Sequence, residues 1–219
     1  MSDSLSAVLT GLGLGIALAG APGPVQAVLL SEALRGGVGR GLRAMLGANI
    51  TLGVLLLALA LGVSFAAPSE PLLRVLKIVG GAFLIFLGID GFRSVSASST
   101  GVDPSTQGRR ELPPAARAAL AVILNPPAWL FLATAASSLM AAATQVGGTS
   151  TAVLAALALL LGVAAGDGTL VVAGGLGLRR ARSEIGRSVR RGLAIILALL
   201  GASLIVSGLL SYILPLPLS

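Results

Sequence analysis

The sequence predicts an all-α integral membrane protein with six transmembrane helices, and three observations lead to this fold class. The chain of 219 residues is 55% hydrophobic and only 11% charged, whereas globular domains average about 25% charged residues. Its apolar runs reach the roughly 20 residues that a helix needs to cross about 30 Å of hydrocarbon. Its basic residues fall mostly in short stretches between those runs, which is typical of membrane topology.

Six apolar segments can be drawn within a single transmembrane domain, residues 1–219. We expect helices over residues 5–31, 42–66, 72–92, 116–142, 150–176 and 192–214. Prolines fall in or near the connections at Pro68, Pro71, Pro113 and Pro114, and Pro215 and Pro217 end the last segment. Proline is easily accommodated there because no helical hydrogen bond is lost.

The basic residues predict the orientation. All but two of the 15 Lys and Arg residues follow the first, third or fifth segment, and the connection over 143–149 carries no charge. Basic connections face the cytoplasm, so we expect both termini on the external or periplasmic side of a bacterial inner membrane. Residues 1–6 hold Asp3 and no basic residue, which favours a retained first helix over a cleaved signal.

A Ser-, Thr-, Gly- and Pro-rich stretch over 94–115 predicts a flexible cytoplasmic linker. It separates two halves of three helices, residues 5–92 and 116–214. Because three is odd, the second half must enter the membrane in the opposite orientation. This plan fits a 3+3 inverted repeat, which is common in transporters, and it also fits six helices without internal symmetry.

Helix-breaking residues interrupt the first helix of each half. Pro22-Gly23-Pro24 lies inside the first segment, and Asn125-Pro126 followed by a second proline lies inside the fourth. Each proline removes an amide donor and obstructs the preceding turn. Carbonyls freed within a bilayer need protein or a wet cavity to satisfy them. Paired interruptions in two halves therefore indicate a transport site, and the alternative is a pair of packing kinks.

Polar residues in two further helices are expected at a depth in the bilayer similar to that of the two helix breaks. Asn49 in the second segment and Asp167 in the fifth are each expected about 12 Å inside the basic face. A carboxylate at bilayer depth costs about 2.5–3.5 kcal/mol on insertion scales. Asp167 is therefore expected to bind an ammonium group, relay a proton, or both; the structural alternative is a hydrogen bond to Asn49 or to broken backbone.

The other ionisable residues carry weaker expectations. We expect Asp90 to pair locally with Arg93 at i, i+3, and Glu32 to be solvated beside Arg35. Lys77, near the external end of the third segment, is a candidate for an exit path.

Composition excludes several classes of function. The chain has no Cys and no His, so disulfides, thiol or imidazole metal sites and Cys–His or Ser–His catalysis are ruled out. We expect no enzyme activity, no metal and no cofactor. No basic domain remains outside the membrane, so nucleic acid is not an expected partner.

These motifs resemble the LysE/RhtB-type translocator family of amino-acid exporters over nearly the whole chain. The matching features are Pro22-Gly23-Pro24, a glycine-rich basic turn, a Lys-then-Gly pattern in the third helix, Asn125-Pro126, and an Asp in the fifth helix, here Asp167. The family usually has Asn where this chain has Val25, and Lys where it has Pro127. The resemblance implies efflux coupled to entry of a proton or another cation.

The function expected from these features is secondary export of an amino acid or a related small polar metabolite. The expected substrate-binding residues are Pro22, Gly23, Pro24, Gln26, Asn49, Asn125, Pro126 and Asp167, with Asp167 also as proton relay. Cation or metal efflux and a non-transporting membrane scaffold or lipid-handling protein are the alternatives. The glycine-rich helix faces are compatible with a homodimer.

Overall fold

The computed structural model describes residues 2–63, 69–97, 112–180 and 183–213. These residues form α1 (Ser2–Gly20), α2 (Pro24–Ala60), α3 (Glu70–Ala97), α4 (Pro114–Ile123), α5 (Pro126–Phe131), α6 (Ser137–Arg180) and α7 (Ser183–Ile213). A π-helical segment, η2 (Leu132–Ala136), joins α5 to α6. Five of the helices are long and apolar enough to cross a membrane. The predicted all-α membrane fold is confirmed.

Two glycine pairs bend the longest helices into successive transmembrane passes. α2 has 37 residues, about 55 Å at 1.5 Å per residue, which is nearly twice the hydrocarbon thickness of about 30 Å. It leaves helical geometry at Gly36 and Gly37, and α6 does so at Gly147 and Gly148. The second glycine of each pair has a positive φ, 77° and 69°, which glycine adopts without steric cost.

The helices extend further than the sequence predicts. The expected basic turn over 36–41 is non-helical only at Gly36 and Gly37. The connection over 143–149 is non-helical only at Gly147 and Gly148. Residues 94–97 of the predicted linker continue α3, and Pro114 already begins α4. Polar residues outside the hydrocarbon still form helical hydrogen bonds, so a fall in hydropathy does not end a helix. Residues 98–111 of the linker lie outside the described residues.

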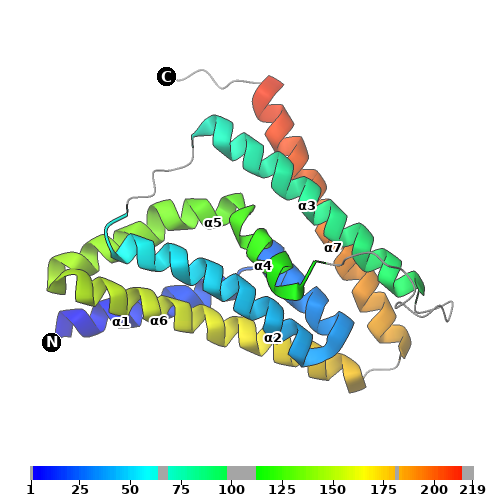
Figure 1. The fold of residues 1–219 in the computed structure, drawn as a ribbon, viewed down its shortest axis with the longest axis horizontal. Coiled ribbons are helices and arrows are strands. Elements are labelled where there is room, and N and C mark those ends of the chain that lie inside the picture. Colours follow the sequence, from blue (N-terminus) through cyan, green and yellow to red (C-terminus); the bar gives the residue numbers. More distant parts are fainter. Residues whose placement is uncertain (1, 64–68, 98–111, 181–182, 214–219) are drawn as a thin grey trace.

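The helices divide into a body and an arm. α1 and α2 pack along α6, and α4 packs on α2, whereas α3 and α7 pack mainly on each other. Figure 1 shows α3 and α7 side by side, slanting away from the other helices. Glycines allow the close approach in both parts: a Cβ added at Gly15 would lie 2.0 Å from the Leu159 carbonyl oxygen, and one at Gly81 would lie 2.5 Å from that of Gly201.

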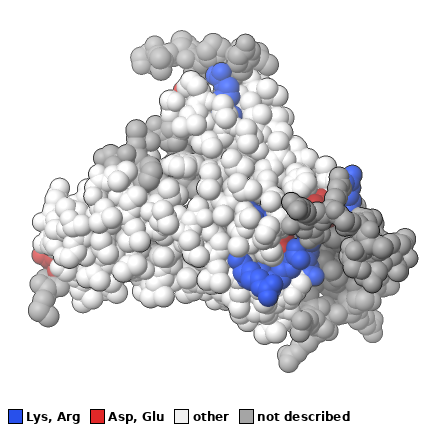
Figure 2. Space-filling view, in the orientation of Figure 1, with Lys and Arg blue, Asp and Glu red and all other residues white. Residues whose placement is uncertain are grey.

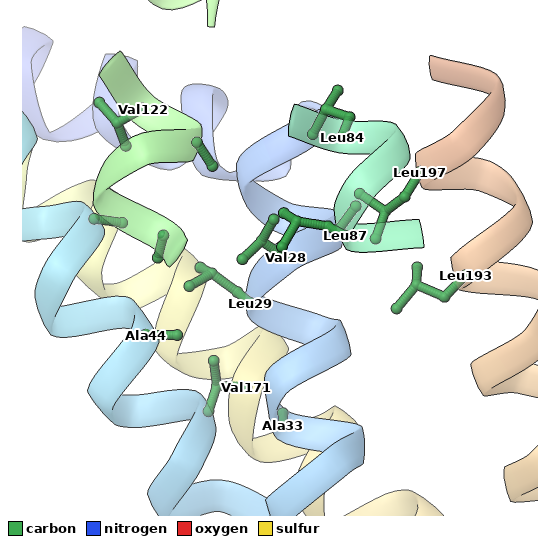
Figure 3. Close-up of a cluster of buried hydrophobic side chains, with 14 residues drawn as sticks. Val28, Leu29, Ala33, Ala44, Leu84, Leu87, Val122, Val171, Leu193 and Leu197 are labelled. Atoms are coloured by element: carbon green, nitrogen blue, oxygen red, sulfur yellow. The ribbon is translucent and has the colours of Figure 1, made fainter. Parts of the chain in front are cut away.

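The buried apolar residues form two clusters. Cluster A gathers Val28, Leu29, Leu87, Val122 and Val171 with their neighbours (Figure 3). Cluster B gathers Leu52, Leu56, Leu132, Leu159 and Val163 with theirs. Each cluster draws on both halves of the chain, so the halves share one interior.

One end of the molecule is basic. It is the end where α2 bends at Gly36 and Gly37 and where α4 begins. This end holds Arg35, Arg40, Arg43 and Arg117. In Figure 2 the visible Lys and Arg atoms gather mainly there, while most of the remaining described surface is neutral. Cluster A lies toward this basic end, and cluster B lies on the other side of residues 49 and 167.

Candidate functional site

A polar layer separates the two apolar clusters. In α2, cluster A ends at Ala48 and cluster B begins at Leu52, so Asn49 lies between them. In α6, cluster B ends at Val163 and cluster A resumes at Val171, with Asp167 between them. Because an apolar interior is continuous in most helix bundles, an interruption at the same level in facing helices marks a layer with a separate role.

Both helix breaks also fall in the gap between the clusters. The first break, Pro22–Pro24, comes before the cluster A residues that begin at Ala27. The second break, Asn125–Pro126, lies between Val122 of cluster A and Leu132 of cluster B. The two helix breaks, Asn49 and Asp167 therefore each lie where the apolar packing of their own segment is interrupted.

Asp167 is the most deeply buried acid of this layer, with 1% of its surface exposed. Its Oδ1 atom and both side-chain polar atoms of Asn49 have no hydrogen-bond partner among the described residues. The Asn49 amide lies near the Asp167 carboxylate, but not in the geometry of a formed hydrogen bond.

Two helix contacts bring the first break to the level of Asp167. A Cβ added at Gly166 would lie 2.5 Å from Ala19, near the end of α1, and one at Gly174 would lie 2.4 Å from Leu30 of α2. Residues 22–26 connect these two contact points along the chain, and Asp167 directly follows Gly166 on α6. The first break therefore lies at about the level of Asp167 along α6.

The first break leaves backbone donors open. Gly23 is extended, with φ −161° and ψ −179°, and α2 begins directly after it. Ala27 donates to the Gly23 carbonyl, but no backbone hydrogen bond from the amides of Val25 or Gln26 occurs among the described residues. The first amides of a helix have no partner within the helix, and they favour an anion.

The second break is closed by its own residues. Asn125 N donates to the Val122 carbonyl, and Ala128 N donates to that of Asn125. The indole Nε1 of Trp129 donates to the Ile123 carbonyl at 2.7 Å. Pro126 and Pro127 have no amide hydrogen to offer. The second break therefore offers no free amide, because its two prolines carry none and these bonds use the others.

Three further predicted residues make no hydrogen bond to Asp167 or Asn49 among the described residues. Asn125 is part-buried with an unpartnered Oδ1, and no hydrogen bond joins it to either residue within the described part of the chain. Gln26 is part-buried, with its Oε1 near Gly23, 3.3 Å from a Cβ added there. Lys77 lies on the arm, where its Cβ would be 3.2 Å from a Cβ added at Gly208 of α7.

Two expectations about acids are wrong. Glu32 is not solvated: 1% of its surface is exposed, because α2 folds back over it after Gly36. Asp90 pairs with Arg35 at 2.9 Å and with Arg117 at 2.7 Å rather than with Arg93. Tertiary packing brings these distant arginines closer than the neighbour in sequence.

These acids belong to a buried ion-pair network at the basic end, which the sequence did not reveal. Glu32 pairs with Arg117 at 3.3 Å, with Arg35 at 3.7 Å and with Arg40. Arg117 is 2% exposed, although in the sequence it belongs to the basic residues that follow the third apolar segment. Its burial could have been foreseen, because Arg117 shares one face of α4 with Ala118, Ala121 and Val122.

A separate hollow of about 500 Å³ opens between α1 and residues 135–146. Its lining is mainly apolar, with polar side chains from Asp3, Ser6, Thr10 and Ser138. None of the predicted site residues lines it. It therefore does not coincide with the polar layer.

Comparisons with known proteins agree with the fold and the motifs. A family model described as "LysE type translocator" matches residues 16–208. The chain is 32% identical over 114 residues to an uncharacterized membrane protein of Pseudomonas aeruginosa; the match spans 50% of this chain and 53% of that relative. No solved structure matches. Since the family match spans most of the chain, including both breaks, Asn49 and Asp167, the chain belongs to the LysE type translocator family.

Proposed function

We propose that this protein exports an amino acid or a related small zwitterion across the bacterial inner membrane. Membership of the translocator family makes it a multi-pass membrane protein that moves a small solute. The solute, the energy source and the direction are parts of the proposal. The observation that carries it is that Asp167 and Asn49 are buried with side-chain polar atoms that lack hydrogen-bond partners, at about the level of the helix start at Pro24.

The chemistry of this layer suits a zwitterion. Asp167 offers a carboxylate to an ammonium group, and the carbonyl of the facing Asn49 amide can accept a further hydrogen bond. The amides of Val25 and Gln26 offer donors and the positive end of a helix dipole to a carboxylate. Buried polar atoms without partners cost free energy, about 1–3 kcal/mol each, so a ligand that satisfies them recovers that cost.

The packing of the halves supports alternating access. α1 of the first half packs on the second-half helix α6, and α4 of the second half packs on α2. In a repeat, α1 would correspond to α4, and the part of α2 after Gly37 would correspond to the part of α6 after Gly148. Exchanging the halves then turns the α1–α6 contact into the α4–α2 contact. A 3+3 inverted repeat predicts this exchange. Rocking one half against the other would then open the layer to each side in turn.

Coupling and assembly complete the proposal. When the solute has left, Asp167 can take up a proton from the external side, since an intramembrane carboxylate commonly relays protons. The basic end faces the cytoplasm and both termini face outward. The glycine-rich helix faces would let two copies of the chain pack closely, so a homodimer is the proposed assembly.

The test is efflux from proteoliposomes loaded with a labelled amino-acid mixture, with and without a proton gradient. Asp167→Asn should lower efflux by about tenfold or more, because the amide neither balances an ammonium charge nor carries a proton. Glu70→Gln makes the same acid-to-amide change at an exposed position at the start of α3 and should export normally. Normal efflux by Asp167→Asn, with elution on gel filtration unchanged, would give Asp167 a structural role only.

A further inference from the structure

The ion pairs at the basic end lie where a solute would have to pass from that side to Asp167. Cluster A separates the polar layer from the charges. On each of three elements a charge follows one turn beyond a cluster A residue: Glu32 after Val28, Asp90 after Leu87, and Arg117 before Ala121. The close-up in Figure 3 shows Val28, Leu29 and Leu87 converging in this cluster. The charges thus form the next layer toward the basic end.

Arg117 joins the two halves through this layer. It comes from the second half, and it contacts Glu32 at 3.3 Å and Asp90 at 2.7 Å, both from the first half. Its Nε also donates to the Leu112 carbonyl at 3.0 Å, which holds the side chain in place. Arg35 and Arg40 complete the network, so that three arginines face two acids.

Stability alone does not require such a network. Desolvating charges costs as much as their pairing returns, and apolar residues of similar size often stabilise an interior equally well. Ion pairs differ from apolar contacts in what happens when they separate, because water then solvates each charge. A buried network between two moving parts is therefore suited to exchanging a paired, dry arrangement for a separated, wet one.

We propose that Glu32, Asp90 and Arg117 form an ion-pair lock that closes the basic end in this structure and separates when that end opens to admit solute toward Asp167. The lock rests on the proposed alternating access, but it makes a claim about accessibility that needs no solute. Within the described residues, Glu32 and Arg117 are each at most 2% exposed, and the Asp90 side chain is 25% exposed, so the charges of the lock are largely closed off.

The experiment uses a single cysteine as a reporter, which is unique because the natural chain has none. Val28→Cys places a thiol in cluster A, between the lock and the polar layer, at a position 2% exposed. The labelling rate by a membrane-impermeant thiol reagent is measured on vesicles of both orientations. In the otherwise unchanged protein, labelling from either side should be slow.

The lock variant is Arg117→Met with Asp90→Asn. It removes one charge of each sign, so Glu32 keeps Arg35 and Arg40 and no buried acid is left unpaired. We expect labelling of the reporter to rise by about tenfold from the basic side and to stay slow from the other. Arg93→Met is the matched control: it removes an exposed arginine three residues after Asp90 and should change nothing.

A milder variant provides a second test in case the double variant does not fold. Arg117→Lys keeps the charge but has a single ammonium in place of the planar fork, so it cannot bridge both acids equally well. It should raise labelling by about threefold. Unchanged labelling in the folded variants, or an equal rise with Arg93→Met, overturns the lock. Failure of the proposed function would appear separately, as normal efflux by Asp167→Asn with the labelling results unaffected.

Discussion

Asn49 shows how a residue can lower stability where it serves a site. Both of its side-chain polar atoms are buried without partners among the described residues, although the residue sits in a helix with apolar neighbours at Ala48 and Leu52. A leucine would fill a similar volume at no desolvation cost. The presence of an amide at this position is consistent with binding a ligand at Asp167.

We predict that Asn49→Leu raises the stability of the purified protein and lowers its efflux. Removing two unpartnered buried groups should stabilise the fold by about 1–3 kcal/mol, while the solute loses a polar contact. The measurement is the midpoint of thermal aggregation in detergent, followed by gel filtration, together with the efflux assay. Thr51→Leu is a comparison on the same helix, because the Thr51 hydroxyl already bonds the Gly47 carbonyl. A destabilised but fully active Asn49→Leu protein would show that Asn49 serves the fold.

At the scale of elements, single glycines fix how closely helices approach. In α1, a Cβ at Gly15 would be 2.0 Å from the Leu159 carbonyl oxygen, whereas one at Gly13 would meet nothing within 4 Å. The two positions are two residues apart and face opposite sides of the helix. They therefore form a natural pair for testing the contact of α1 with α6.

Gly15→Ala should destabilise the protein by about 1–3 kcal/mol or more, because overpacking moves α1 away from α6. Gly13→Ala should be neutral or slightly stabilising, since alanine favours a helix over glycine. Thermal stability and yield of monodisperse protein are the readouts. Equal behaviour of the two variants would show that α1 does not approach α6 at this crossing.

The bends at the two glycine pairs depend on backbone conformation and not on space. Gly148 has φ 69° and ψ −166°, and nothing lies within 4 Å of a Cβ added there. This region of conformational space is essentially restricted to glycine, and other residues pay about 1–3 kcal/mol to occupy it. The cost of a substitution here is therefore purely one of backbone strain.

We expect Gly148→Ala to lower the thermal midpoint, as that strain cost implies. Gly39→Ala is the control: its position is equally open and its φ is not positive. Differential scanning fluorimetry in detergent compares the two. A Gly148→Ala protein as stable as Gly39→Ala would contradict the bend at this residue.

At the scale of the whole molecule, the charge distribution predicts the orientation in the membrane. The basic end carries Arg35, Arg40 and Arg43 beside the ion-pair network, and the opposite end carries the exposed bend at Gly147–Gly148. Basic segments resist translocation across the membrane. The two ends should therefore be separated by the bilayer.

Single cysteines at exposed positions test this orientation. Ser150→Cys, beside the second bend, should react with an impermeant thiol reagent in intact cells, and Arg43→Cys should react only in inverted vesicles. Both side chains are exposed. The reverse pattern would invert the proposed topology and turn the lock into an external gate.

The sequence by itself determined the fold class and the positions of the helix breaks, and it predicts the depth of Asp167. Run length, proline and charge counting act locally or through the bilayer, so they can be read without knowing which helices touch. The predicted pairing of Asp90 with Arg93 failed because local spacing does not reveal which distant charge lies nearer.

Only the tertiary structure decided which groups meet. It showed that Asn49 lies near Asp167, that Trp129 closes the second break, and that Arg117 joins the halves through Glu32 and Asp90. Burial and partnership depend on atoms from elements far apart in the chain. A sequence pattern records what each segment can do in a membrane, whereas the packing of segments decides which charges are paired and which remain open to a ligand.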